Sequence, residues 1–155
     1  MLWKTAGETL PIKIYCANND EKLMPAYETS GSSGMDLKSN EDVTIQPGCW
    51  AAVGTGVYVS LYPGLELQVR PRSGLALKKG ITFMNCVGTI DADYRGEIKL
   101  IIHNHGDAPF EIKKYDRIGQ MVLGVVPRLV LEPVSSVDEL TPTERGSGGF
   151  GSTGV

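Results

Sequence analysis

The segment GTIDADYRGE, residues 88–97, concentrates between glycines the side chains that could perform chemistry. It holds two carboxylates, Asp91 and Asp93, together with a tyrosine and an arginine. The chain has only two histidines, so the usual base at neutral pH is scarce. An ionised carboxylate can take a proton from water when it is rigidly aimed. We therefore expect the catalytic proton acceptor to be Asp91 or Asp93.

A second candidate site lies at the start of a predicted short helix. Ser73 is placed to cap its own turn, residues 75–77 continue the helix, and Gly80 ends it after two lysines. Arg72 directly precedes this start. Free backbone N–H groups, a hydroxyl and a guanidinium that converge on one helix N-terminus favour a phosphate. An ordinary capped helix without a ligand is the alternative.

Short apolar runs separated by glycine and proline must position these residues. Residues 57–61 and 65–69 alternate with a period of two, and Pro63–Gly64 between them predicts a turn. Together with one short helix, this pattern predicts an all-β fold of the jelly-roll type. Further strands are expected over residues 12–15, 43–45, 50–53, 81–84, 97–104, 110–112, 119–126 and 129–131.

Length and composition fit one compact domain followed by a short arm. A chain of 155 residues with 41% hydrophobic content can bury a core without covalent staples. A net charge of −3 argues against stable nucleic-acid binding, and no apolar run approaches a membrane span. Residues 145–155 contain five glycines. We therefore expect residues 1–144 to form the β domain and residues 145–155 to form a mobile arm.

The three cysteines, Cys16, Cys49 and Cys86, are widely spaced and form no CxxC pair. This pattern predicts buried free thiols and argues against a disulfide framework or a zinc site. The N-terminus lacks the apolar run of a signal peptide. A reducing intracellular compartment, cytoplasmic by default, is expected, while a nuclear or viral origin stays open.

Five segments occur in this order: SGSSGMDLKS around Asp36, PRSGLALK from Pro71, GTIDADYRGE from Gly88, DRIGQMV from Asp116 and RGSGGFGSTG from Arg145. Together they resemble the motifs of the trimeric-type dUTPase family. Two positions depart from the family pattern: Met35 stands where tyrosine is frequent, and Gly119 stands where alanine is common. Both neighbour matching polar residues, so we expect packing adjustments without loss of activity.

The resemblance implies hydrolysis of dUTP to dUMP and pyrophosphate by attack of water on the α-phosphorus. Such an activity limits uracil incorporation into DNA and supplies dUMP for dTMP synthesis. The resemblance implies that Asp91 activates the water and that Gln120 and Arg145 also act in catalysis, while Asp93 supports the turn. A dCTP deaminase-like enzyme and a catalytically silent nucleotide-binding module are the alternatives.

The same resemblance implies the substrate contacts. The backbone of a hairpin would read the uracil edge, and the ring of Tyr94 would leave no room for a ribose 2′-hydroxyl. Lys99 is a further candidate whose alternative is a solvated strand lysine. The hairpin residues are Asn85, Gly88, Thr89 and Ile90, and the remaining contacts are Arg72, Ser73, Gly74, Asp91, Lys99, Gln120, Arg145, Phe150, Gly151 and Ser152.

Mg²⁺ and a second copy of the chain are the expected partners beside dUTP. The sequence holds no dedicated ligand cluster, so the resemblance implies a metal held by phosphate oxygens and water, with Asp36 helping indirectly. A turn or assembly role for Asp36 is the alternative. The family further implies a homotrimer whose active sites are shared between subunits. It also implies that residues 145–155 close over the active site, often that of a neighbouring subunit.

Overall fold

The structure, a computed structural model, describes residues 9–149 as a β-fold with one short helix. Helix α1 spans Ser73–Lys79, and single 3₁₀ turns lie at Ala17–Asn19, Glu21–Leu23 and Val137–Glu139. In this described part the strands are β1 (Lys13–Cys16), β2 (Gly34–Lys38), β3 (Val43–Ile45), β4 (Trp50–Gly54), β5 (Val57–Ser60), β6 (Leu65–Arg70), β7 (Ile81–Phe83), β8 (Gly88–Ile90), β9 (Lys99–Asn104), β10 (Phe110–Ile112) and β11 (Arg117–Val125).

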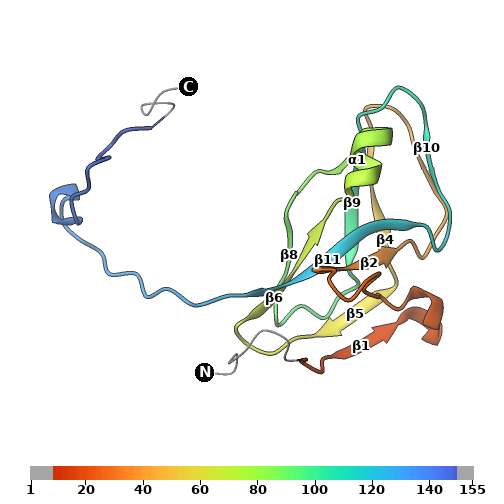
Figure 1. The fold of residues 1–155 in the computed structure, drawn as a ribbon, viewed down its shortest axis with the longest axis horizontal. Coiled ribbons are helices and arrows are strands. Elements are labelled where there is room, and N and C mark those ends of the chain that lie inside the picture. Colours follow the sequence, from red (N-terminus) through yellow and green to blue (C-terminus); the bar gives the residue numbers. More distant parts are fainter. Residues whose placement is uncertain (1–8, 150–155) are drawn as a thin grey trace.

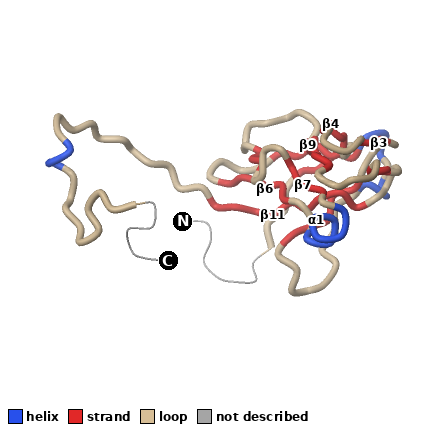
Figure 2. The backbone as a smooth tube through the Cα atoms, turned by 90° about the horizontal axis from the view of Figure 1, so that it is seen from above, coloured by secondary structure: helices blue, strands red, loops and turns tan. Residues whose placement is uncertain are grey.

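The strands form antiparallel sheets around a single body (Figure 1). One sheet has the order β2-β11-β6-β8 and another the order β4-β9-β7, while β1 pairs with β5 and β10 with β3. Beyond β11, residues 126–149 lead away from the body as an extended arm, and the predicted segment from residue 145 is its last part. Figure 2 shows the arm from a perpendicular direction. The expected all-β, jelly-roll-like fold is confirmed.

Alternation along the strands builds the core. Leu65, Leu67 and Val69 of β6 are buried, and the two residues between them are half-buried. Leu100 and Ile102 of β9 are fully buried. Burial of each such side chain stabilises the fold by about 1.5–3 kcal/mol. The period-two pattern predicted for residues 65–69 is thereby confirmed, as is the turn before it, where Gly64 has a φ of +87°.

One predicted strand is wrong. Leu129, Val130 and Leu131 lie in the arm, where they are 84%, 88% and 85% exposed. An apolar run becomes a strand only where a neighbour pairs with it and covers one face. Among residues 9–149, no strand pairs with this run.

Two strands were not predicted, and the cap of α1 differs from expectation. β2 and β8 lie inside glycine-containing motif segments, whose polar residues obscure the strand pattern. The helix from Ser73 to a left-handed Gly80 is confirmed. However, Arg72 occupies the N-cap and its side chain makes no capping bond, so Ser73 is the first helical residue and not its own cap.

The prediction of buried thiols holds for one cysteine only. Cys16 is buried, and this burial raises the pKa of its thiol. Cys49 and Cys86 are exposed, so the prediction is wrong for them. Each follows directly on a turn, where no second layer of side chains covers the chain.

An inserted residue in β11 decides which of its side chains face β2. Gln120 lies opposite Asp36 and Gly119 opposite Leu37, but Lys38 lies opposite Arg117, so one residue of β11 is extra. In a regular strand, residues three apart point to opposite faces. The bulge returns Arg117 and Gln120 to the same face, which is a common use of bulges beside active sites.

The core packs directly against the strand at this bulge. A Cβ atom built on buried Gly119 would lie 2.6 Å from Leu100 Cδ1 and 2.9 Å from Phe83 Cζ. These two side chains therefore fill the space that the methyl group of an alanine would need. The packing around this position therefore suits glycine in this chain.

Gly119→Ala should destabilise this chain, although alanine is common at this position in the family that the sequence resembles. Overpacking against Leu100 and Phe83 is expected to lower the free energy of unfolding by about 1–3 kcal/mol, measured by urea unfolding at one protein concentration. Gly31→Ala is the matched control, because a Cβ there meets nothing within 4 Å. Adding Leu100→Val should cost less in the Gly119→Ala background than alone. Equal stability of Gly119→Ala and the unaltered chain would contradict this packing argument.

Candidate active site

Four of the residues expected to contact phosphate gather around one hollow. β11 lies between β2 and β6, and β6 leads directly into α1, so three separate motif segments meet here. The hollow has a volume of about 320 Å³. Its lining is Glu28, Ser32, Ser33, Gly34, Asp36, Arg72, Ser73, Gly74 and Gln120.

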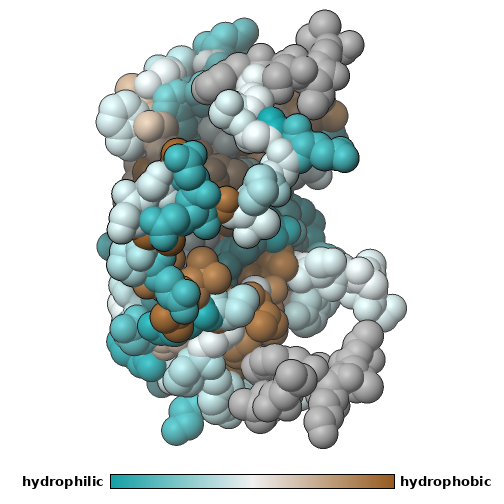
Figure 3. Space-filling model, turned by 90° about the vertical axis from the view of Figure 1, so that its left-hand side faces the viewer, coloured by the Kyte–Doolittle hydropathy of each residue, from teal (hydrophilic) through white to brown (hydrophobic). Residues whose placement is uncertain are grey.

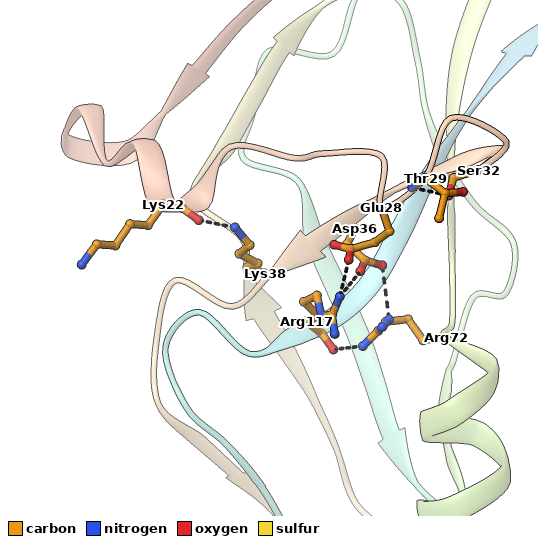
Figure 4. Close-up of polar contacts among 8 residues, drawn as sticks. All are labelled: Lys22, Glu28, Thr29, Ser32, Asp36, Lys38, Arg72 and Arg117. Atoms are coloured by element: carbon orange, nitrogen blue, oxygen red, sulfur yellow. Dashed lines mark hydrogen bonds and ion pairs between the residues drawn. The ribbon is translucent and has the colours of Figure 1, made fainter.

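A carboxylate between two guanidinium groups forms one wall of this hollow (Figure 4). Asp36 Oδ1 lies 3.2 Å from Arg72 Nε, and Asp36 Oδ2 lies 3.3 Å from Arg117 Nη1. Arg117 Nη1 also contacts Glu28 Oε2 at 2.9 Å. The hydrogen bond and charge of Glu28, together with the charge of Asp36, raise the pKa of Arg117. Since the Asp36 side chain is only 12% exposed, its two contacts are screened less by solvent than the exposed pair of Arg117 and Glu28.

The charged side chains of Glu28, Asp36, Arg72 and Arg117, called here the clamp, fix the orientation of Arg72. Its Nε faces Asp36, and its Nη1 donates to the carbonyl oxygen of Arg117 at 3.2 Å. The guanidinium plane is therefore fixed by two contacts, with Nη2 left for a ligand. Arg117 was not singled out from the sequence. Its place one residue after Asp116 in the fourth motif segment was the available signal.

The start of α1 adds backbone donors to the same hollow. The amides of Leu75 and Ala76 donate to Arg72 O, whereas Ser73 and Gly74 have no backbone acceptor within the described chain. Their N–H groups are among those that every helix leaves free at its N-terminus. A Cβ on Gly74 would meet nothing within 4 Å, so this entrance is open.

Gln120 is held across the hollow by its own amide. Its Nε2 donates to the carbonyl of Pro71 at 3.1 Å. Its Oε1 lies over Gly34, where a Cβ would approach to 2.6 Å. Glycine at position 34 thus permits the close crossing of β2 and the Gln120 side chain.

Asp91 lies in a different hollow. It lines a volume of about 570 Å³ together with Asp93, Arg95 and residues of the β5–β6 turn. Ile90 pairs with Leu67 of β6, which places Asp91 beside Glu66, six residues before Arg72. At about 3.3 Å per strand residue, this separation is roughly 20 Å. One chain therefore does not bring Asp91 to the residues expected to contact phosphate.

Neither candidate base forms an ion pair in the described part of the chain. Asp91 and Asp93 are both exposed. Arg95 does not form an ion pair with Asp93 in the described chain; its Nη1 donates to the carbonyl oxygens of Ala92 and Tyr94, each at 2.7 Å. The arginine therefore fixes the turn that follows Asp91.

The tyrosine of this segment is fixed over a glycine. Tyr94 donates its hydroxyl hydrogen to the carbonyl oxygen of Glu97 at 2.9 Å and remains 42% exposed. A Cβ on Gly96 would overlap the tyrosine ring and hydroxyl. The ring is thus held in place with a surface available to a ligand.

The hairpin before Asp91 presents backbone more than side chains. Ile90 is 8% exposed and belongs to the core, while Thr89 is exposed. A Cβ on Gly88 would lie 2.6 Å from Val69 Cγ2 and 3.1 Å from Asn85 Nδ2. Glycine is therefore required where the hairpin folds back on β6.

Two expected site residues, Lys99 and Arg145, lie apart from both hollows. Lys99 Nζ pairs with Glu97 Oε2 at 3.6 Å and lines neither hollow. Arg145 lies in the extended arm, where its Nε donates to Gly148 O at 2.7 Å. Phe150, Gly151 and Ser152 lie outside the described residues.

The donor groups provide no dedicated metal cage. Residues 9–149 contain no group of three His, Cys, Asp or Glu side chains that could hold an ion. Both oxygens of Asp36 already face guanidinium groups. In the same part of the chain, no helix is long and apolar enough to cross a membrane.

Comparison with known proteins identifies the family of this chain. The dUTPase family model matches residues 20–154. A deoxyuridine 5′-triphosphate nucleotidohydrolase from Nautilia profundicola is 54% identical over 136 residues, covering 88% of this chain and 94% of the relative.

Solved structures show the same fold. Staphylococcus bacteriophage 80alpha dUTPase with dUPNHPP superposes with a TM-score of 0.84 at 26% identity, covering 95% of this chain and 100% of that one. A mutant dUTPase from phage phi11 of S. aureus has a TM-score of 0.74 at 22% identity, covering 83% and 99%, and is described as coordinating a structural Mg(II) ion. The family match and the 54% identical relative carry the conclusion that this chain belongs to the dUTPase family.

Proposed function

We propose that this protein hydrolyses dUTP to dUMP and pyrophosphate in active sites that two or more copies of the chain complete together. The observation that carries the shared site is the separation of Asp91 from the Arg72 hollow by roughly 20 Å along β6. A base and a phosphate cradle this far apart in one chain cannot act on one α-phosphate. A neighbouring chain can supply the missing half.

In the proposed reaction, Asp91 takes a proton from water as the water oxygen bonds to the α-phosphorus. The bond from that phosphorus to the bridging oxygen breaks, and the electron pair leaves with pyrophosphate. Positioning and charge stabilisation supply most of the rate enhancement in such transfers. Arg72, Gln120 and the free N–H groups of Ser73 and Gly74 would hold the phosphate chain.

Specificity is proposed to come from the third motif segment. The backbone of residues 85–90 would pair with the uracil edge, which leaves polar groups unpaired if cytosine binds. The fixed ring of Tyr94 would exclude a ribose 2′-hydroxyl. In this scheme Asp93 supports the turn.

A magnesium ion fits this site as a companion of the substrate. The donor set is acidic at the hollow, with Glu28 and Asp36, but Asp36 is occupied by arginines. Bound Mg²⁺ would spread the negative charge of the phosphates and of the leaving pyrophosphate. Asp36 would contribute through water, while its direct task is to orient Arg72.

A homotrimer is the proposed assembly. Large hydrophobic side chains remain exposed on the single chain, and Figure 3 shows hydrophobic surface on one face between hydrophilic regions. Exposed apolar area of this kind marks interaction surfaces. Residues 1–144 would form the trimer, and residues 145–155 would close over a site and bring Arg145 to the phosphates.

The three free thiols suit a reducing, cytoplasmic compartment.

Substrate selectivity tests the reaction. With Mg²⁺, pyrophosphate should be released from dUTP and not from dCTP, dTTP or UTP, and no ammonia should form. Asp91→Asn should lower kcat by about 10²–10⁴-fold, because shape is kept and basicity lost, with binding of a non-hydrolysable analogue retained. Asp93→Asn is the matched control and should keep most of the activity. Ammonia from dCTP would favour the deaminase, and no turnover of any nucleotide would favour a silent binding module.

Mixed oligomers test the shared site. Arg72→Gln and Asp91→Asn chains should each be inactive, but refolding them together in equal amounts should restore about a quarter of wild-type turnover, because random mixing rebuilds that share of sites. Each variant refolded alone is the control. A mixture as inactive as its components would contradict sites that combine these residues from different chains.

Removal of residues 145–155 tests the arm. The truncated chain should keep its oligomeric state and thermal unfolding, because none of the core residues found in the described part of the chain is removed. Its kcat/KM should fall by about 10²-fold or more, as expected when a phosphate-contacting arginine and a closing segment are lost. Full activity of the truncated oligomer would show that the arm has no part in turnover.

A further inference from the structure

The arm contains an ordered turn around Arg145, formed by residues 143–148 and called here the arginine turn. The amide of Gly146 donates to Thr143 O at 3.1 Å and to Thr143 Oγ1 at 3.2 Å. The amide of Gly148 donates to Arg145 O at 3.0 Å. In return, Arg145 Nε donates to Gly148 O at 2.7 Å. The arginine is therefore tied into its own turn through backbone and side chain.

These bonds leave the phosphate-binding edge of Arg145 available. A guanidinium has five N–H donors, and only the one on Nε is used within the turn. Arg145 forms no ion pair with any residue from 9 to 149. Its two terminal nitrogens can thus approach phosphate oxygens side by side, the geometry in which arginine binds phosphate best.

Thr143 is the side chain that closes the arginine turn. A threonine hydroxyl that accepts from a following amide stabilises turns of this kind. Gly146 has a left-handed φ of +50°, which glycine adopts without strain. Pro142 directly before Thr143 stiffens the entry to the turn.

We propose that Thr143 is a positioning residue, which holds Arg145 in its phosphate-binding geometry before the arm closes. A glycine-rich arm loses conformational freedom when it closes over a ligand, and a turn formed in advance reduces that loss. The inference deepens the proposed function and rests on it, because it concerns how Arg145 reaches the site.

Isosteric substitution separates the hydroxyl from the shape of the side chain. Thr143→Val should lower kcat/KM for dUTP by about fivefold, the effect of one lost hydrogen bond, mainly through a higher KM and with kcat within about twofold. Thr143→Ser keeps the acceptor and should restore wild-type kinetics. Thr141→Val is the matched control, because Thr141 lies in the same arm and forms no hydrogen bond within the described chain.

A double-mutant cycle tests whether Thr143 acts through Arg145. In an Arg145→Ala background, Thr143→Val should have no further effect on kcat/KM. An equal fold-loss in both backgrounds, or wild-type kinetics of Thr143→Val, would overturn the proposed role.

Amide exchange gives a readout that does not need activity. In the full-length chain labelled with ¹⁵N-glycine, the Gly146 amide should exchange more slowly than in Thr143→Val, while the Gly149 amide should be unaffected. Equal exchange of Gly146 in both proteins would overturn the proposed role of the threonine hydroxyl, because Thr143→Val keeps the carbonyl oxygen that also accepts from this amide. Failure of the unaltered chain to release pyrophosphate from dUTP would instead contradict the proposed function.

Discussion

The position of β11 between β2 and β6 is the constraint on which the hollow lined by Asp36, Arg72 and Gln120 depends. Through this pairing Gln120 lies opposite both Asp36 of β2 and Arg70 at the end of β6. The chain then enters α1 three residues later, so the helix start meets the same edge. Segments that are 36 and 48 residues apart in sequence, at Asp36, Arg72 and Gln120, thereby share one hollow of about 320 Å³.

The bulge turns this pairing into a working arrangement. Without the extra residue, the Arg117 side chain would point away from Asp36, and the ion pair between them would be lost. The bulge is in turn packed from below by Leu100 and Phe83 at Gly119. The polar geometry of the hollow is thus linked to the buried core of the neighbouring sheet.

The sequence predicted well what depends on local pattern. The buried alternation of residues 65–69, the helix after Arg72 and the glycine that ends it all follow from short-range chemistry. It did not predict what depends on long-range pairing. Arg117 became important only because an inserted residue turned it toward Asp36, and the apolar run of residues 129–131 lacked a strand partner in its own chain. The wide separation of Asp91 from Arg72 is likewise a consequence of register, which no motif records.

The charges that line this hollow explain why triphosphate binding would be coupled to closure of the arm in the proposed mechanism. Glu28 and Asp36 carry two negative charges, and Arg72 and Arg117 carry two positive charges, so the clamp is formally neutral. A triphosphate brought into this hollow needs further positive charge, because burying unpaired charge is costly. The helix start supplies only partial charge. In the proposed mechanism, a divalent cation and Arg145 of the arm supply this positive charge. Substrate affinity would therefore depend on closure of the arm.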